Sequence, residues 1–285
     1  MRISGIEECY RPDTLEEALR ILHAHEGEAA VVGGGLGIAA ANDDNVKALI
    51  FLDGIGLKDI TENGNEVRIG SRVPLNELIH SGTAKNYMGG QLTGVLKGVS
   101  TELIRNQMTI GGALIPDRRF SDIATALLAA RADVVIFGEN GQSRISLDDF
   151  YGRFEAVKGA IIKGICLNKD YSSYNFGMER FVRTATDSPL VNIAIMFKTE
   201  GNVIRDVSIA AGCGKSPTER FGEGEDFLRG RSLDEKTAGE FSAYVEQNLN
   251  ASDDYRISGE YRRHLAGVFA GRILRRAGVK DGSGL

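Results

Sequence analysis

Four dense clusters of glycine constrain this chain more than any other feature of its sequence. Glycine makes up 36 of the 285 residues, nearly twice the usual share of about 7%. The clusters lie at residues 31–37, 86–91, 109–112 and 210–214. Glycine accepts positive φ and has no Cβ, so these clusters predict tight turns and places where the backbone approaches a ligand closely.

Composition narrows the class of protein. Hydrophobic residues make up 42% of the chain and charged residues 26%, which is typical of a soluble globular protein, and the length suggests about two domains. The net charge of −5 argues against a protein that binds nucleic-acid phosphates. The apolar runs are far shorter than the roughly 18 residues of a membrane span, and the N-terminus has no apolar secretory core. We expect a cytoplasmic protein without membrane insertion.

Cysteine and histidine are few and scattered. The three cysteines, Cys9, Cys166 and Cys213, lie far apart, as do the four histidines. This spacing does not suit metal or iron–sulfur ligands, and an odd number of cysteines does not suit a disulfide framework. A nucleophile elbow, a Ser-His-Asp order and a metalloprotease motif are also absent from the sequence. We therefore predict neither a metal site nor a catalytic residue on this chain.

The hydrophobic periodicity predicts an α+β protein. In the first region, residues 1–55, Thr14 and Glu17 have the spacing of a capping box, and apolar residues then repeat at helical intervals. Two short apolar runs, 29–32 and 48–52, predict buried strands that end at glycine or Asp-Gly. The region is therefore expected to form a small layer of helix and strand.

The remaining residues predict two further regions. Over 56–170, Asn63-Gly64 predicts a hairpin turn and Ser121 predicts the cap of a helix over 122–130. The polar stretch 169–174 indicates a boundary. Beyond it we expect a small sheet and three helices, with strands near 181–183, 191–197 and 203–211 and helices over 218–228, 234–248 and 259–277.

The first glycine cluster follows a predicted strand. Consecutive glycines let successive N–H groups point into one concavity, which suits phosphate oxygens, although a tight turn alone also requires glycine. Gly35-x-Gly37-x-x-Ala40 also fits the dinucleotide-binding fingerprint, with Asp53 about 20 residues from its start. A Rossmann site needs a full crossover helix, and only residues 38–47 are left for it. That alternative is the weaker interpretation.

The second glycine cluster combines groups that suit a nucleotide cofactor. Thr109-Ile110-Gly111-Gly112 places a hydroxyl beside two glycines, and backbone N–H groups with a hydroxyl suit a pyrophosphate. Ten residues beyond Gly112, Asp122 stands at a predicted helix start. A carboxylate there suits the two hydroxyls of a ribose, but the helix dipole alone also favours it. Both interpretations of Asp122 stay open.

In their order and spacing, these motifs resemble the FAD-binding medium subunit of the molybdenum hydroxylases, the family of xanthine dehydrogenase and carbon monoxide dehydrogenase. The resemblance runs through nearly the whole chain. Besides the two glycine loops, it rests on Tyr10-Arg11-Pro12, Ile104-Arg105-Asn106, Ser121-Asp122, Ala126-Leu127-Leu128 and Arg256-x-Ser258-Gly259-Glu260-Tyr261-Arg262-Arg263.

The resemblance implies a two-subdomain FAD-binding domain of the vanillyl-alcohol-oxidase type at residues 1–170, with subdomains of about 1–55 and 56–170. A C-terminal domain of the molybdenum hydroxylase flavoprotein type, a small antiparallel sheet plus a three-helix bundle, would follow at 171–285. The two glycine loops would hold the FAD pyrophosphate. The cofactor-binding residues implied are Val32, Gly33, Gly34, Gly35, Leu36, Gly37, Ile38, Val99, Thr109, Ile110, Gly111, Gly112, Ala113, Asp122, Ile162 and Arg180.

These residues would have different roles. The resemblance implies that Asp122 binds the ribose, that Val99 and Ile162 make apolar contacts to the cofactor, and that Arg180 lies near a basic position of the family. Four polar side chains typical of the family are missing, because the chain has Gly35, Leu36, Ala113 and Ala160 at those positions. Each lost neutral hydrogen bond costs about 0.5–1.5 kcal/mol, so weaker or differently arranged FAD binding is expected.

By resemblance, the function is that of an electron-transfer subunit. A molybdenum-binding large subunit would oxidise the substrate, with xanthine or a related purine as the commonest case in the family. An iron–sulfur small subunit would carry the electrons to FAD on this chain. NAD or another acceptor would then receive them. Two alternatives remain: a flavin-free assembly subunit of the same complex, suggested by the missing polar side chains, and an independent NAD-binding dehydrogenase, suggested by the Rossmann-like pattern.

Overall fold

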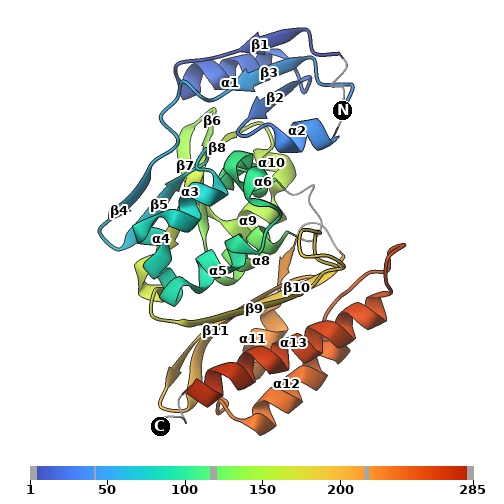
Figure 1. The fold of residues 1–285 in the computed structure, drawn as a ribbon. Coiled ribbons are helices and arrows are strands. Elements are labelled where there is room, and N and C mark those ends of the chain that lie inside the picture. The colour runs from blue at the N-terminus through green and yellow to red at the C-terminus, as the bar shows by residue number, and fades with distance from the viewer. Residues whose placement is uncertain (1–4, 42, 116–120, 215–217, 281–285) are drawn as a thin grey trace. The chain divides into compact units, whose positions relative to one another are not determined.

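The computed structural model describes residues 5–41, 43–115, 121–214 and 218–280. Within it the chain forms two compact units, each made of separate stretches of sequence (Figure 1). Unit 1 comprises Met1–Ala84, Thr101–Ile115 and Ala132–Asn168, and unit 2 comprises Lys85–Ser100, Pro116–Arg131 and Lys169–Leu285. These units do not test the predicted domain boundary near residue 170, which stays a prediction.

Unit 1 begins with a small parallel sheet of the strand order β1-β3-β2. Its strands are β1 (Glu8–Tyr10), β2 (Ala29–Val32) and β3 (Ala48–Phe51). Helix α1 (Leu15–Ala24) begins after Thr14, whose hydroxyl caps the helix by accepting a hydrogen bond from the N–H of Glu17. Its continuous apolar side packs on this sheet. The short helix α2 (Leu36–Ala41) connects β2 to β3.

The second sheet of unit 1 is antiparallel, with the order β4-β5-β8-β6-β7. Ile161 and Phe137 of this sheet pack against the same core as α1, so the helix is covered from both sheets. The strands are β4 (Ile60–Asn63), β5 (Glu66–Gly70), β6 (Asp133–Gly138), β7 (Gly141–Ser146) and β8 (Ile161–Asn168).

Short helices complete unit 1. They are α3 (Leu75–His80), α6 (Glu102–Gln107), α7 (Ile110–Ala113), α9 (Leu147–Gly152) and α10 (Phe154–Val157). Helix α4 (Gly82–Asn86) carries the chain from unit 1 into unit 2. Helices α3 and α6 pack on one another, and α7 packs on β5 and β8, so the second glycine cluster is anchored to the antiparallel sheet.

Unit 2 is built on an antiparallel sheet of the order β12-β11-β10-β9. Helix α8 packs on β10 and β11, and all eight of its residues are buried. The strands are β9 (Asn175–Phe181), β10 (Val191–Glu200), β11 (Val203–Gly212) and β12 (Glu219–Arg220). Both faces of the two central strands are therefore covered, which explains their nearly continuous apolar sequence.

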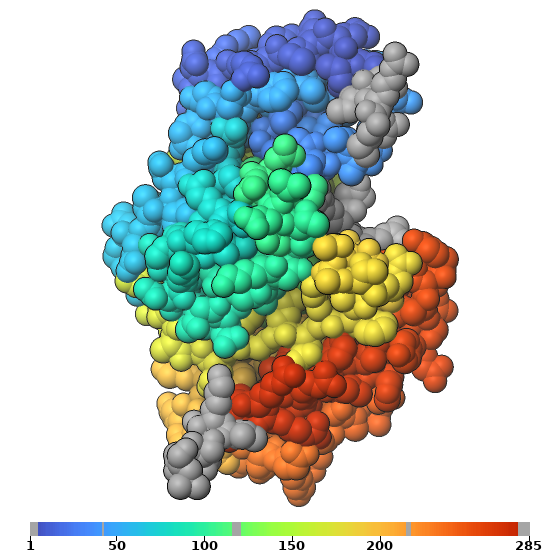
Figure 2. Space-filling view, in the orientation of Figure 1, coloured from blue at the N-terminus to red at the C-terminus, as the bar shows by residue number. Residues whose placement is uncertain are grey.

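The remaining elements of unit 2 are helical. Helices α12 and α13 lie side by side, as the orange and red ribbons of Figure 1 show, and atoms of both helices are visible in the same colours in Figure 2. Together with α11 they form one hydrophobic core with the sheet. The helices are η1 (Tyr87–Gly90), α5 (Gln91–Lys97), α8 (Asp122–Ala129), η2 (Lys169–Tyr171), α11 (Gly222–Leu228), α12 (Glu235–Asn248) and α13 (Gly259–Lys280).

The predicted α+β class is confirmed, and most predicted elements are present, but two boundaries were wrong. The strand expected near 181–183 is β9, which ends at Phe181. The helix expected from residue 218 begins at Gly222, because Glu219 and Arg220 pair with β11 first. The structure also contains α2 in the stretch where the sequence left too little room for a long crossover helix.

Candidate functional site

The first glycine loop passes directly against the second one within unit 1. A Cβ on Gly33 would lie 2.6 Å from the hydroxyl oxygen of Thr109. A Cβ on Gly34 would lie 1.7 Å from the carbonyl oxygen of Gln107. Cβ atoms do not approach other atoms so closely, so both positions require glycine. The two loops that the sequence assigned to one ligand are therefore brought together.

Helix α2 begins directly after this contact. Gly35 has a φ of +78°, which favours glycine, and its carbonyl accepts a hydrogen bond from the N–H of Ala39 at 3.0 Å. The first N–H groups of an α-helix have no acceptor within the helix. Those of Leu36, Gly37 and Ile38 are therefore the donors that this loop offers to an anion.

The second loop uses most of its backbone donors within the protein. The N–H groups of Ile110, Gly111 and Ala113 donate to backbone carbonyls at 3.0, 2.9 and 3.0 Å. The N–H of Gly112 donates to the hydroxyl of Thr109, which caps α7, over a longer distance of 3.2 Å. A ligand would thus meet the Gly112 N–H and the Thr109 hydroxyl rather than the whole loop.

The two glycines of this loop have different surroundings. Gly111 is buried, and a Cβ on it would lie 2.7 Å from the Cβ of Ser71. Gly112 is exposed, and the only atom near a Cβ on it would be the Thr109 hydroxyl oxygen at 3.1 Å. The close packing of Gly111 on Ser71 holds the loop beside the end of β5, whereas Gly112 lies on the outer side, where its N–H donates to the Thr109 hydroxyl.

The two loops fit a pyrophosphate. Glycine at two contact points removes the Cβ atoms that would separate the loops, and the N-terminus of α2 supplies backbone donors beside them. Ala113, where the resemblance implies a polar residue, is only 2% exposed. Its methyl group packs inside the protein, so the substitution removes a polar side chain without placing an apolar one on the outer surface.

Asp122 lies in unit 2, where its carboxylate is held by other side chains. It is 5% exposed. Its Oδ2 accepts a hydrogen bond from Arg180 at 2.6 Å and its Oδ1 accepts one from Asn192 at 2.8 Å. Burial raises the pKa of the Asp122 carboxyl, and the amide of Asn192 and the charge of Arg180 act in the opposite direction. A contact between Asp122 and a ribose stays a prediction.

The other predicted contact residues are divided between the units. Val32 and Ile162 lie on β2 and β8 of unit 1, where Val32 is buried and Ile162 is half-buried. Val99 and Arg180 belong to unit 2. Val99 follows the end of α5 and is half-buried, and the guanidinium of Arg180 donates to the carbonyl of Gly98 at 2.7 Å.

Sequence reasoning did not find Asn192, which is fully buried on β10. Its Oδ1 accepts hydrogen bonds from the hydroxyl of Thr125 at 2.9 Å and from the N–H of Gly212 at 3.0 Å. A signal was available, because a single amide in an otherwise apolar strand needs hydrogen-bond partners. Ser71 and Gln107, which contact the glycine loops, carry no comparable signal in the sequence.

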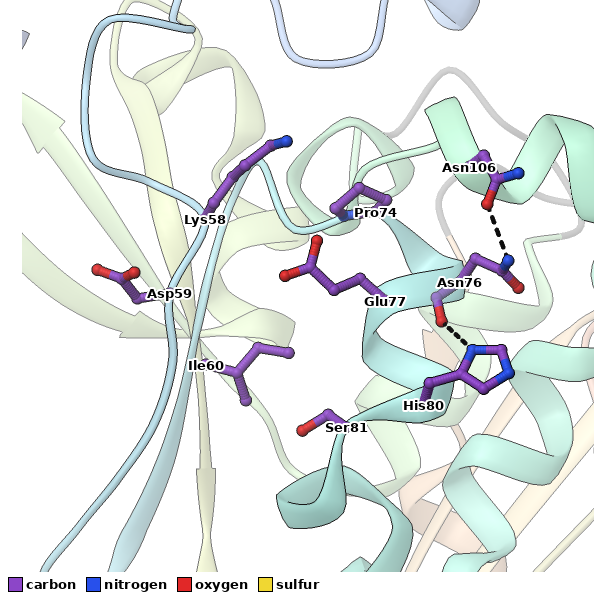
Figure 3. A pocket seen from close by; sticks show the side chains of 9 residues that line it. All are labelled: Lys58, Asp59, Ile60, Pro74, Asn76, Glu77, His80, Ser81 and Asn106. Carbon is purple, nitrogen blue, oxygen red and sulfur yellow. Dashed lines mark hydrogen bonds between the residues drawn. The ribbon is translucent and has the colours of Figure 1, made fainter.

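A further cavity in unit 1, of about 720 Å³, contains none of the predicted site residues. It lies between the chain entering β4 and helix α3, and Glu77 points into it (Figure 3). Asn76 donates to Asn106 at 2.8 Å along its rim. Across the described parts of the chain, no cluster of three or more side chains suits a metal ion and no helix is long and apolar enough to cross a membrane.

The fold is α+β, and the two glycine loops are suited to a ligand with a diphosphate. Residues 4–167 match the model of the FAD binding domain in molybdopterin dehydrogenase, and residues 178–277 match the CO dehydrogenase flavoprotein C-terminal domain. The chain belongs to this family of FAD-binding oxidoreductase subunits. The family and the fold expected from the sequence are confirmed.

Individual relatives resemble the chain over nearly its whole length. The nicotine 6-hydroxylase medium subunit of Paenarthrobacter nicotinovorans is 26% identical over 275 residues, covering 94% of this chain and 96% of its own. The glyceraldehyde dehydrogenase medium chain of Sulfolobus acidocaldarius is 25% identical, covering 90% and 93%. A chain of quinoline 2-oxidoreductase from Pseudomonas putida 86 has the same fold, with a TM-score of 0.87, 21% identity and coverage of 98% and 99%.

Proposed function

We propose that this chain is the electron-transfer subunit of a molybdenum hydroxylase. It would assemble with an iron–sulfur small subunit and a molybdenum-binding large subunit, receive electrons from the iron–sulfur clusters and deliver them to NAD or another acceptor. The observation that carries the proposal is the match over at least nine-tenths of both chains to two relatives that are themselves the medium subunit and the medium chain of oxidising enzymes. FAD supplies chemistry in steps of one or two electrons, which suits a link between clusters and a two-electron acceptor.

The residues of this chain bind and orient the cofactor. The N–H groups at the start of α2, the Gly112 N–H and the Thr109 hydroxyl are proposed to hold the pyrophosphate. Asp122 is proposed to accept hydrogen bonds from the ribose through lone pairs that its protein partners leave available. Val99 and Ile162 are proposed to contact apolar parts of the cofactor and to exclude water from them.

The composition of the native protein tests this function. Purified from its own cells, the chain is expected to elute with two partners, one containing iron and sulfur and one containing molybdenum, and to show the visible absorption of FAD. Mass spectrometry of the subunits, metal analysis and chromatography of the released flavin measure this. A native complex without flavin would favour the assembly subunit, and an active monomer that turns over substrate with NAD alone would favour the independent dehydrogenase.

The substrate would bind to the large partner, so this chain does not select it. For the whole complex we propose oxidation of xanthine or a related purine. Turnover of purines should be compared with turnover of nicotine-like heterocycles and of aldehydes, the compounds in the names of the two relatives. Activity confined to the latter compounds would reject the purine.

Replacing Gly112 by valine should remove FAD binding while the fold survives. The position is exposed, and its Cβ would meet only the Thr109 hydroxyl oxygen at 3.1 Å. A branched side chain there would cover the Gly112 N–H, so we expect FAD affinity to fall by at least about a hundredfold. Fluorescence titration of the flavin-free protein measures the affinity, and circular dichroism measures the unfolding midpoint.

Gly111→Val is the matched comparison for this prediction. A Cβ at Gly111 would lie 2.7 Å from the Cβ and 2.9 Å from the carbonyl oxygen of Ser71, so this variant should lose stability first. Asp122→Ala is less informative, because it also breaks the contact with Arg180. A folded Gly112→Val protein with its full flavin content would show that the loop is only a structural turn.

A further inference from the structure

Arg180, which lies on β9, binds other groups of unit 2 through its guanidinium. Its Nη1 donates to Oδ2 of Asp122 at 2.6 Å. Its Nη2 donates to the carbonyl of Gly98 at 2.7 Å and to that of Ala185 at 3.2 Å. The side chain is 23% exposed. One planar guanidinium therefore joins three segments that lie far apart in the sequence.

The carboxylate that Arg180 contacts is fixed at both oxygens. Asn192 donates to the other oxygen of Asp122 at 2.8 Å, and its own carbonyl oxygen is held by Thr125 and Gly212. All of these groups belong to unit 2. Because Asn192 is fully buried, the carboxylate cannot change orientation without leaving buried polar atoms unpaired.

The carbonyl that Arg180 contacts ends helix α5. The N–H of Gly98 donates to Val95 at 3.0 Å and the N–H of Val99 donates to Leu96 at 3.1 Å, so the chain still turns tightly here. A Cβ on Gly98 would lie 3.3 Å from Nη2 of Arg180. Gly98 and Arg180 both line a hollow of about 220 Å³ whose walls include Phe176 and Met178. The guanidinium of Arg180 thus holds Gly98, the residue before Val99, at the edge of this hollow.

We propose that Arg180 is a positioning residue that fixes two FAD-contacting segments of unit 2 at once, the Asp122 carboxylate and the turn at Gly98 and Val99. The inference rests on the proposed function, because both segments are proposed cofactor contacts. Direct recognition of FAD by Arg180 is not required. Lysine has a single ammonium and cannot reproduce a fork that serves a carboxylate and a carbonyl together.

Arg180→Lys tests the role in the full chain, freed of flavin and titrated again with FAD. We expect the affinity for FAD to fall by about ten- to a hundredfold, because contacts to a charged group and to the turn are both weakened. The visible circular dichroism of the flavin that still binds should also change, since its surroundings are less well fixed. A role confined to folding would leave that spectrum unchanged.

Arg131→Lys is the matched control. Arg131 also lies in unit 2, is also 23% exposed, and donates to both oxygens of Asp206 at 2.8 and 2.7 Å and to the carbonyl of Val207 at 2.9 Å. Arg131→Lys should lower the unfolding midpoint of the flavin-free protein about as much as Arg180→Lys does. The affinity for FAD should change less than about threefold, since none of its contacts is a proposed cofactor residue.

Each outcome supports or overturns a defined claim. If the wild-type chain takes up no FAD, the proposed function fails. If the wild type binds FAD and Arg180→Lys binds it equally well with an unchanged spectrum, only the positioning role fails. Should Arg180→Lys not fold, Gly98→Ala replaces it, because its Cβ would push the guanidinium while keeping the charge. Normal FAD affinity in that variant would overturn the role of Arg180.

Discussion

Gly34→Ala is expected to abolish FAD uptake and to destabilise unit 1. The new Cβ would lie 1.7 Å from the carbonyl oxygen and 2.8 Å from the carbonyl carbon of Gln107. Both are backbone atoms, so no rotation of a side chain relieves the overlap, and the two glycine loops must separate. Overpacking costs typically 1–3 kcal/mol when side chains can adjust, so we expect a loss of at least about 3 kcal/mol here.

Gly56→Ala provides the control for this experiment. Gly56 also lies in unit 1, and a Cβ on it would meet no atom within 4 Å. Chemical denaturation and FAD titration of the two variants should therefore differ sharply. Equal stability and equal FAD affinity for Gly34→Ala and the wild type would mean that the loops do not lie together as described.

The elements with strong local signals were the ones predictable from sequence. Thr14 caps α1 and Ser121 caps α8, each accepting a hydrogen bond from the N–H three residues on. Asn63-Gly64 begins the turn between β4 and β5, where Gly64 has a φ of +56°. Caps and turns depend on residues within a few positions of one another, so the sequence predicts them without knowledge of the tertiary fold.

Elements fixed by distant partners were not predictable in the same way. Strand β1 has three residues and no apolar run, and it forms because it pairs in parallel with β3 about 40 residues further along the chain. Glu219 and Arg220 join β11 as a short strand before α11 begins. In both cases pairing across the sheet decides the local structure.

The site shows the same division. The clustered glycines predicted both loops as candidate binding sites. Nothing in the sequence, however, distinguished Gly111, which packs on Ser71, from Gly112, which is exposed. Nor did it indicate that Asp122 is paired with Arg180 across 58 residues of sequence. Residue type predicted which groups could bind a cofactor, and only the tertiary arrangement separates them from groups that hold the site together.

A second group of paired charges in unit 2 surrounds Asp254. Its Oδ2 pairs with Arg256 at 2.7 Å and with Arg262 at 2.6 Å. Arg262 is fully buried and also donates to the carbonyl of Ser252 at 2.9 Å. Gly214, with a φ of +94°, makes room for this guanidinium, because a Cβ there would lie 2.0 Å from its Nη1. Removing the carboxylate charge would leave a buried cation without its anion.

Asp254→Asn should therefore lower the free energy of unfolding by about 3–5 kcal/mol at pH 7. Burial alone raises the pKa of Asp254, but the hydrogen bonds from Arg256 and Arg262 outweigh it and hold the pKa well below its usual range. Because the folded-state pKa lies below the unfolded value of about 3.9, this stabilisation is present above about pH 4 and is lost as the pH falls through the folded-state pKa.

Urea denaturation between pH 3 and pH 7 measures this dependence, and the difference between wild type and Asp254→Asn should shrink toward the acid end. Glu200→Gln is the control, since Glu200 pairs with Arg205 at 3.1 Å on the surface, where both side chains are more than half exposed. An exposed pair contributes less than about 1 kcal/mol. A difference for Asp254→Asn as small as that of the control, or one that stays constant with pH, would show that the cluster around Arg262 is not held by the Asp254 charge.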